Sequence, residues 1–403
     1  MQVFIARQPI FDQRQRVAAY ELLFRSSAEN LFPRTDADHA SESVISESLL
    51  VFGFGELTGW KRAFIHFTRG LLVRQAAMLL PPDKVVIEIL ESVEPDPPVL
   101  RACEALKKGG YWLALGNFAL EPRYERLAEL ADIIKVDFLA ARDHQRRAFV
   151  ERFQPRRIKL LAEKVETLDD FTEALGLGYD FFEGYFFCTP EIISRTDIPV
   201  RKQAYLRLLR DLNDPEVNFD RLEMLIKQDV ALSVKLLRYI NSAWFGLSRK
   251  VLSIRHALVL LGTEVVRQWA TLATVTGLGY DRPDELITTS LLRATFCERL
   301  AVPLRIPRRA AELFLVGLLS PLDALMGRPM DELLTEIAVP DDVRAALLGE
   351  PCHLREIYRL VLAYERGDWD GVIALATSLR LDEDLLPGIY QQSVQWVNQV
   401  LST

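Results

Sequence analysis

Up to about residue 196, short apolar runs alternate with longer amphipathic segments, such as 41–54 and 97–109. Short apolar runs bounded by polar turns are typical of buried strands, and apolar spacing at i, i+3 and i+4 is typical of helices. The expected strands are 17–23, 63–67, 85–89, 111–115, 133–136, 158–162 and 181–187. This alternation predicts an α/β fold with a mostly parallel sheet, as a closed barrel or a doubly wound sheet. No G-x-G-x-x-G follows a strand, so a Rossmann dinucleotide site lacks its fingerprint.

From about Val200 the rhythm becomes helical. The expected helices include 203–215, 218–229, 230–246 and 253–275, and later prolines fall between helices. We therefore expect two domains, a barrel over residues 1–197 and an all-helical domain over 198–403. A chain of 403 residues also exceeds what one core usually serves. No long Gly/Ser linker joins the halves, so close packing of the two domains is expected.

Composition narrows the function classes. The net charge is −7, which argues against non-specific nucleic-acid binding, because that requires a basic surface. The 4 cysteines are scattered, without a C-x-x-C pair, and are expected to be ordinary reduced thiols. No segment has the length of apolar sequence that a membrane span requires, and the N-terminus lacks a signal-peptide pattern. A cytoplasmic protein without membrane contact is expected.

Polar residues stand at the ends of the expected strands. In a βα barrel the carboxyl ends of the strands form the functional mouth. The candidates are Glu21, His66, Glu88, Asn117, Lys135, Asp137, Glu163, Glu166 and Glu183. Converging carboxylates suit divalent cations, and two such cations can activate water against a phosphodiester. The alternative is that these residues pair with each other and with Lys135 and have no catalytic use.

Residues 1 to about 195 resemble the EAL domain, the bacterial cyclic-di-GMP phosphodiesterase barrel. The matching motifs, in order, are YELLFR, VVIEILES, DIIKVD, LLAEKVET and FFEGYFFCTP. The resemblance implies a (β/α)8-type barrel whose first strand runs antiparallel to the rest. It also implies a two-metal site built from the positions of Glu21, Glu88, Lys135 and Glu163.

The departures from that pattern concern the metal ligands. His66 stands where the family has asparagine, and Gly116-Asn117 replace its aspartate pair. Glu183 stands at the usual glutamine. Two cations about 4 Å apart repel strongly and require bridging anionic oxygens. With two carboxylates missing, we expect no catalytic residues and no bound metal, Mg or Mn included, and treat the matched positions as relics.

Ligand binding without turnover is a separate possibility for this half. Arg25 could meet a phosphate with two donors, or form a salt bridge on the barrel rim. The remaining candidates for ligand contact are the strand-end residues named above, from Glu21 to Glu183.

The helical half lacks the ligands of an HD-type phosphohydrolase. None of the histidines is followed by aspartate. His256 is expected to cap or pack near a helix start, and His353 to be a surface or helix-start residue. The stretch DVALSVKLLRYINSAWFG resembles the HDOD domain, a metal-free relative of the HD enzymes. Ser320-Pro321 occupy the place of the His-Asp pair, and Pro321 should disturb the helix.

One further cluster in this half, Asn241, Ser242, Trp244 and Phe245, could form a small binding surface. The interpretation we favour is structural, with the polar pair satisfying backbone groups and the aromatic pair filling the core.

The order of the halves resembles the bacterial EAL–HDOD signalling proteins, the YuxH-like group. The leading expectation is a non-enzymatic regulatory scaffold linked to cyclic-di-GMP pathways and motility, acting through protein–protein interaction. One alternative is a cyclic-di-GMP sensor without hydrolysis. The other is a weak phosphodiesterase with unusual metal use through His66 and Glu183. The expected partners are unidentified signalling proteins, possibly cyclic-di-GMP, and a second copy of the chain.

Overall fold

The computed structural model divides the chain into two compact units. The first comprises Met1–Thr189, Leu362–Ala374 and Asp382–Asn398, and the second comprises Pro190–Val361, Leu375–Leu381 and Gln399–Thr403. The structure describes residues 3–26, 54–116, 122–188, 200–214, 217–228, 230–240, 251, 253–278, 282–337 and 339–401. The predicted boundary at 197/198 and the expected helix over 41–53 lie outside these residues.

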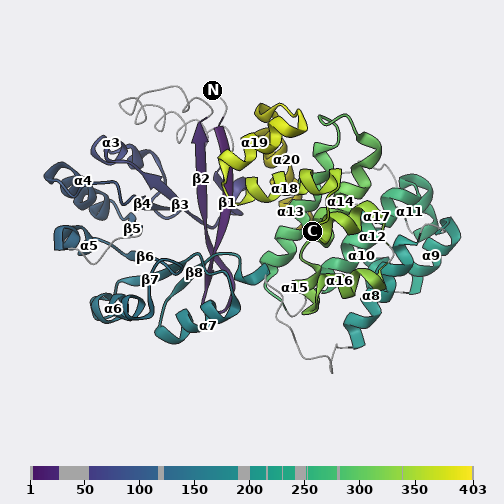
Figure 1. Cartoon of the computed structure of the whole chain (residues 1–403), viewed down its shortest axis with the longest axis horizontal. Coiled ribbons are helices and arrows are strands. Elements are labelled where there is room, and N and C mark those ends of the chain that lie inside the picture. The colour runs from purple at the N-terminus through teal and green to yellow at the C-terminus, as the bar shows by residue number, and fades with distance from the viewer. Residues whose placement is uncertain are drawn as a thin grey trace. The chain divides into compact units, whose positions relative to one another are not determined.

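The first unit is a closed barrel of eight strands in the order β1 to β8, which confirms the predicted fold class (Figure 1). Strands β2 to β8 pair in parallel. The strands are β1 Val3–Asp12, β2 Val17–Ser26, β3 Arg62–Phe67, β4 Val85–Ile89, β5 Trp112–Leu115, β6 Ile133–Asp137, β7 Lys159–Glu163 and β8 Phe181–Glu183. Each apolar run expected to be a strand therefore forms one, although β8 ends before Gly184.

β1 is the strand that hydrophobic spacing alone did not predict. Its sequence carries Arg7 and Gln8 next to Pro9, so it lacks a clean alternation of apolar residues. It pairs antiparallel with both β2 and β8 and thereby closes the barrel. The antiparallel first strand implied by the EAL resemblance is confirmed.

One layer of apolar side chains fills the barrel interior. Its buried members are Ile10, Ala19, Phe64, Val86, Ala114, Ile133 and Leu161, with Trp112 and Phe181 packed against them. Side chains of a strand alternate between its two faces, so the residue two positions further on points to the same side. Six interior residues are each followed, two positions later, by a polar residue: Ala19 by Glu21, Phe64 by His66, Val86 by Glu88, Ile133 by Lys135, Leu161 by Glu163 and Phe181 by Glu183. The pleat thus places this polar set directly above the apolar layer, at the mouth.

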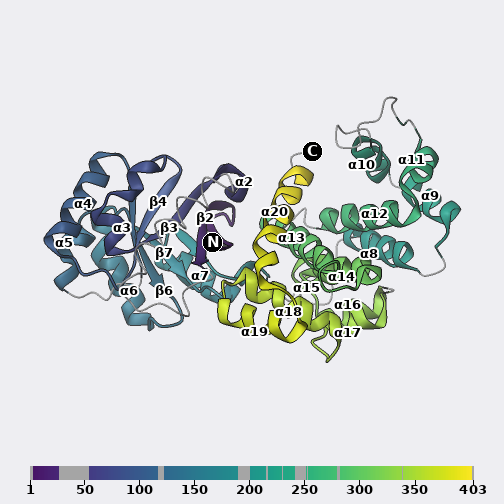
Figure 2. The same cartoon turned by 90° about the horizontal axis from the view of Figure 1, so that it is seen from above.

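Helices surround the strands on the outside, and Figure 2 shows α4, α5 and α6 on that outer side. They are α2 Phe54–Thr58, α3 Arg69–Val73, α4 Pro97–Lys108, α5 Glu125–Ala128, α6 Asp143–Phe153 and α7 Leu168–Leu177. The chain also makes short 3-10 turns at Ala76–Leu79, Pro122–Tyr124, Gln154–Arg156 and Phe186–Cys188. α4 shows how local sequence sets these helices. Asp96 caps its start by accepting from the Val99 amide, and a proline opens its first turn.

The described part of the second unit is helical. Its helices are α8 Val200–Asn213, α9 Phe219–Gln228, α10 Val230–Ile240, α11 Ile254–Leu261, α12 Thr263–Leu278, α13 Asp284–Leu300, α14 Ala310–Leu319, α15 Leu322–Met326, α16 Met330–Glu336 and α17 Asp341–Leu347. A 3-10 turn at Pro307–Arg309 precedes α14. The segment expected as one helix over 253–275 is two, because Gly262 adopts a φ of 84° between α11 and α12.

The last helices are shared between the units. They are α18 His353–Glu365, α19 Trp369–Leu379 and α20 Leu386–Leu401, with a 3-10 turn at Glu383–Leu385. Pro387 lies in the first turn of α20, not between helices, which its fixed φ permits.

Parts of these helices belong to the barrel unit and pack against β1. The ring of Phe4 lies 6.3 Å from that of Tyr364 and 5.7 Å from that of Trp369. Gln395 and Asn398 of α20 donate hydrogen bonds of 2.6 Å to the side chain and the carbonyl of Glu56. Residues from the far end of the sequence are therefore part of the barrel's surroundings.

Candidate functional site

The ammonium group of Lys135 stands at the centre of the barrel mouth. Its Nζ lies 2.5 Å from Glu21 Oε2, 2.9 Å from Glu88 Oε2, 2.7 Å from Glu163 Oε1 and 3.5 Å from Glu183 Oε2. The Lys135 side chain is 0% exposed. A buried charge is costly unless paired, and here one cation is shared by four carboxylates from four strands. The mouth is therefore rich in negative charge relative to its own fixed cation.

Burial and charge act in opposite directions on these groups. Burial would lower the pKa of Lys135, but the carboxylates, Glu163 and Glu183 foremost, raise it well above its ordinary value. Burial would raise the pKa of Glu21, yet the charge of Lys135 lowers it below its usual range. Burial prevails at Glu163 and Glu183, and both pKa values are raised. The charge of Lys135 therefore favours the ionised form of Glu21, whereas burial disfavours the ionised forms of Glu163 and Glu183.

His66 adds a second cation to the ring. Its Nε2 lies 3.0 Å from Glu21 Oε1 and 3.4 Å from Glu88 Oε1. Burial disfavours the imidazolium, but the charge of Glu88 and the hydrogen bonds to both carboxylates raise the pKa of His66 to about 10. In the absence of a metal, His66 and Lys135 together offset part of the carboxylate charge.

Glu183 reaches the ring because the chain turns sharply behind it. Gly184 has a φ of 146°, and a Cβ there would lie 2.1 Å from the Val165 carbonyl oxygen. Only glycine allows this approach, which the Val165 amide secures by donating to the Glu183 carbonyl at 2.9 Å. Glu183 is 5% exposed, and its Oε2 has no hydrogen-bond partner among the described residues. That buried oxygen faces the same space as Glu21 and Glu163.

Gly116 follows β5 at the position of the missing aspartate. A Cβ built on it would lie 3.3 Å from Glu88 Oε1, so a side chain there would point at the ring. The described chain offers no carboxylate at this point of the mouth, and Asn117 lies outside the described residues. The ring therefore has an acidic side formed by Glu21, Glu163 and Glu183 and an open side beside Glu88.

Two further predicted candidates, Asp137 and Glu166, lie outside the ring. Asp137 accepts from the Leu139 and Ala140 amides at 2.9 Å and from Lys164 Nζ at 2.7 Å. Burial would raise the pKa of Asp137, but these donors lower it. Glu166 is exposed to solvent. Arg25 lies in β2, and its side chain is outside the described residues.

Two groups of ring residues have the arrangement that a divalent cation requires. The donor atoms of Glu21, His66 and Glu88 lie within 4.8 Å of one another, and so do those of Glu21, Glu163 and Glu183. Carboxylate oxygens with one imidazole suit Mg²⁺ or Mn²⁺, and Glu21 is common to both groups. The buried Oε2 of Glu183 makes no hydrogen bond among the described residues and has only Lys135 Nζ, at 3.5 Å, as an ion-pair partner. On this observation the residues fit divalent metal binding.

The corresponding position of the helical unit is built differently. α14 ends at Leu319, and Pro321 precedes α15, so the helix breaks at Ser320-Pro321 as predicted. Ser320 Oγ donates to the Gly317 carbonyl at 2.8 Å and accepts from Arg293 Nη1 at 3.2 Å. Arg293 is buried on α13. The hydroxyl of Ser320, at the place matched to the His-Asp pair, therefore faces a guanidinium, and the two groups offer no cation site.

The two histidines of this unit have structural positions. His256 lies in the first turn of α11, where Ser253 Oγ accepts from its amide at 3.2 Å. His353 opens α18, which confirms its predicted place at a helix start. The cluster Asn241, Ser242, Trp244 and Phe245 lies outside the described residues.

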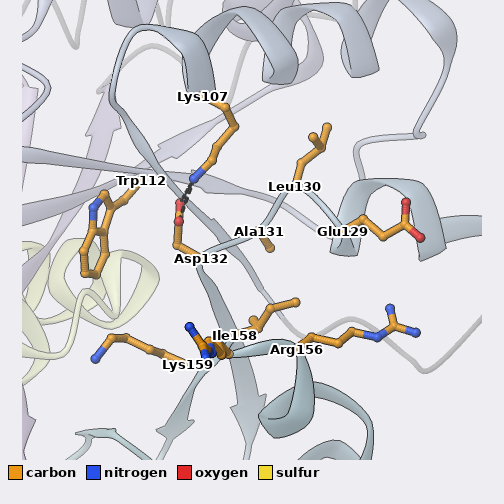
Figure 3. A pocket seen from close by; sticks show the side chains of 10 residues that line it. Lys107, Trp112, Glu129, Leu130, Ala131, Asp132, Arg156, Ile158 and Lys159 are labelled. Carbon is orange, nitrogen blue, oxygen red and sulfur yellow. Dashed lines mark hydrogen bonds and ion pairs between the residues drawn. The ribbon is translucent and has the colours of Figure 1, made fainter.

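A hollow of about 510 Å³ lies at the opposite end of the barrel, before β5, β6 and β7 (Figure 3). Its lining is mixed in charge. Lys107 Nζ donates to both carboxylate oxygens of Asp132 at 2.6 Å, and Arg156 pairs with Glu125 at 2.6 Å. Since these cations are taken up by neighbouring acids, the hollow is not a strong candidate for an anion site.

The comparisons with known proteins cover both halves of the chain. Residues 198–330 match the HDOD domain. The chain is 35% identical over 409 residues to the uncharacterized protein YuxH of Bacillus subtilis, covering 100% of this chain and 99% of that protein. It is 36% identical over 372 residues to the cyclic di-GMP phosphodiesterase CdgJ of Vibrio cholerae, covering 92% of this chain and 86% of CdgJ.

The chain belongs to the EAL–HDOD family. This membership links it to cyclic-di-GMP pathways. The prediction that the chain is a catalytically inactive homologue is wrong by this comparison, because CdgJ, alike over most of its length, is named a phosphodiesterase. No described helix of this EAL–HDOD protein has the length and apolar character to cross a membrane.

Solved structures with a similar barrel include a manganese/cyclic-di-GMP complex of Klebsiella pneumoniae BlrP1, with 24% identity and a TM-score of 0.40. The match covers 46% of this chain and 55% of that one, about half the length of BlrP1. A phosphodiesterase, PaMucR, in complex with c-di-GMP shows 20% identity and a TM-score of 0.39, covering 46% of this chain and 95% of that one.

Two residues that border the mouth, Gln8 and Arg366, could not be found from the sequence. Gln8 of β1 is the register partner of Glu21. Near it, the turn after α18 contributes Arg366, whose carbonyl accepts from Gln8 Nε2 at 3.4 Å. No spacing rule could have joined residues so far apart in the chain, although the antiparallel first strand points to Gln8.

Proposed function

We propose that the barrel is a metal-dependent cyclic-di-GMP phosphodiesterase. The observation that carries this proposal is the pair of donor groups at the mouth, Glu21–His66–Glu88 and Glu21–Glu163–Glu183, which share one carboxylate. Two cations bridged by a common carboxylate are a recurrent arrangement in phosphodiester hydrolysis. The named activity of CdgJ supports the same substrate.

Each ring residue has a distinct part in this proposal. The carboxylates of Glu21, Glu88, Glu163 and Glu183, with His66, would hold the cations. Bound there, divalent metal would supply charge to the phosphate oxygens and to an attacking water. Lys135 fixes the orientation of the carboxylates from the centre of the ring and limits their mutual repulsion.

His66 and Glu183 replace the residues usual in the family, and each keeps a donor atom in the ring. His66 must release its proton before Nε2 can serve as a ligand, so metal binding competes with protons at this residue. The expectation from sequence that no metal binds stays a prediction. From the donor geometry we propose instead that a divalent metal binds, and the hydrolysis assay with chelator described below distinguishes binding from no binding.

For the helical unit we propose binding of a protein partner in place of chemistry. The support is the Arg293–Ser320 contact at the His-Asp position and the location of both three-residue donor groups of the described chain in the barrel. The partner's identity, a homodimer and a part in motility stay predictions.

The test is hydrolysis of cyclic di-GMP by the full chain in Mn²⁺, followed by chromatography of the products. We expect turnover by the wild type, loss of at least about 100-fold in Glu21→Gln, and loss of all turnover in excess chelator. Glu104→Gln, which removes an exposed carboxylate on α4, is the matched control and should be unaffected. Turnover that is absent in the wild type, or that persists in Glu21→Gln, would refute the proposal.

A further inference from the structure

The barrel mouth is extended on one side by a two-stranded ribbon. Because β1 runs antiparallel, its first half lies beside the second half of β2. Gln8 pairs with Glu21 at the level of the carboxylate ring, and Val3 pairs with Ser26 beyond it. The ribbon therefore rises above the ring on the side of β1 and β2.

A turn from the C-terminal part of the chain lies against this ribbon. Residues 366–368 connect α18 to α19 within the barrel unit. Gln8 Nε2 donates to the Arg366 carbonyl at 3.4 Å. Gly367 has a φ of 67°, and a Cβ there would lie 2.7 Å from Leu23 Cδ1. The turn thus contacts Gln8, beside Glu21, and Leu23, two residues beyond it.

The side chain of Arg366 points toward the other neighbour of β1. Its guanidinium carbon lies 5.5 Å from the centre of the Tyr185 ring. Glu183 is the last residue of β8, and Tyr185 follows it by two positions. Arg366 is therefore placed next to the strand ends that carry Glu21 and Glu183, although it comes from a different part of the sequence.

Three other cations near the strand ends are already paired in the described part of the chain. Arg69 lies 2.6 Å from Asp96, Arg123 lies 3.2 Å from Glu94, and Lys164 lies 2.7 Å from Asp137. Lys135 and His66 are committed to the carboxylate ring. Arg366 is exposed, and no carboxylate of the described residues forms an ion pair with it.

We infer that Arg366 binds a phosphate group of the cyclic dinucleotide at the mouth, an inference that rests on the proposed function. Cyclic di-GMP carries two phosphate groups, and a phosphate held outside the reach of the ring's own cations is stabilised by positive charge at the border of the mouth. A guanidinium can supply it with two parallel donors, and contact with an aromatic face restricts its position. Arg366 is then a substrate-binding residue contributed by the helices that follow the HDOD match.

The test compares the full-length wild type with Arg366→Met and Arg366→Lys in the Mn²⁺ hydrolysis assay. We expect KM to rise about tenfold in Arg366→Met with kcat changed less than about twofold, as for a contact made equally in ground and transition states. Arg366→Lys should be intermediate, because it keeps the charge and loses the paired donors. Arg157→Met removes an exposed arginine at the opposite end of the barrel and should leave KM unchanged.

Calorimetric titration with cyclic di-GMP in Ca²⁺ separates this inference from the proposed function. Binding without turnover in the wild type, weakened about tenfold by Arg366→Met, would refute hydrolysis and support Arg366 as a phosphate ligand. Turnover with the same KM in Arg366→Met and the wild type would overturn the inference and leave the phosphodiesterase standing. No binding and no turnover in the wild type would overturn both.

Discussion

The barrel mouth and the contact between α13 and α14 offer a cation opposite surroundings. In the barrel, Lys135 and His66 hold four carboxylates close together, and two groups of three donors remain. In the helical unit, Ser320-Pro321 stand at the place of the His-Asp pair, and Ser320 accepts a hydrogen bond from Arg293 of α13. Replacement of motif residues therefore does not by itself decide whether a cation site remains. The barrel mouth keeps metal-donor atoms on neighbouring residues, and the described residues around Ser320 do not.

The largest expected effect concerns the central ammonium of the barrel. Lys135→Met should lower the free energy of unfolding by about 3–5 kcal/mol, because it leaves buried carboxylates without their cation. Lys107→Met breaks a half-exposed pair with Asp132 and should cost about 0–1 kcal/mol. Urea unfolding of both variants in chelator measures the difference. Equal losses would mean that the ring does not depend on Lys135.

The stability of the helical unit should depend on close packing between α13 and α14, whereas the stability of the barrel depends on the charge of Lys135. A Cβ on Gly317 of α14 would lie 2.3 Å from the backbone of Arg293, so Gly317→Ala should destabilise the chain by about 1–3 kcal/mol. Gly176→Ala on α7 meets no atom within 4 Å and should be neutral or stabilise by about 0.5–1 kcal/mol. Thermal unfolding with and without Mn²⁺ tests this, and the metal-induced shift should survive Gly317→Ala. Loss of the metal-induced shift in Gly317→Ala would show that packing of α14 affects metal binding in the barrel.

The pH dependence of the metal-free barrel should identify His66 as part of the charge balance. The folded pKa of His66 is raised to about 10, above an unfolded value of about 6.5. Its stabilising contribution is therefore complete below pH 6.5 and is lost as the pH rises toward 10. The wild type should be more stable than His66→Asn at pH 6, and the gap should close by pH 10. A gap independent of pH would show that His66 does not carry charge.

The smallest expected effect is at the helical position itself. Ser320→Ala removes one hydrogen bond to Arg293 and should cost about 0.5–1.5 kcal/mol. Turnover and metal affinity should stay as in the wild type. A change in either would show that the helical unit contributes to the barrel's chemistry.

Much of the barrel could be predicted from sequence, because short apolar runs mark buried strands and polar residues at the ends of those runs mark the mouth. Glu21, His66, Glu88, Lys135, Glu163 and Glu183 follow that rule. β1 did not, because Arg7, Gln8 and Pro9 interrupt its pattern. The pairing of these carboxylates with Lys135 was one of the two interpretations drawn from sequence, and the structure shows it. Its distances could not be predicted, and neither could the approach of Arg366, because that approach depends on tertiary packing that no local pattern encodes.

The most direct test of the central claim is Mn²⁺ binding to the full chain, measured by calorimetry in the wild type and in Glu21→Gln. Glu21 is the one residue common to both donor groups. Metal binding through both donor groups predicts saturable Mn²⁺ binding in the wild type and in Ser320→Ala. It predicts no binding in Glu21→Gln at concentrations that saturate the wild type. Unchanged binding in Glu21→Gln, or no binding in the wild type, would contradict it.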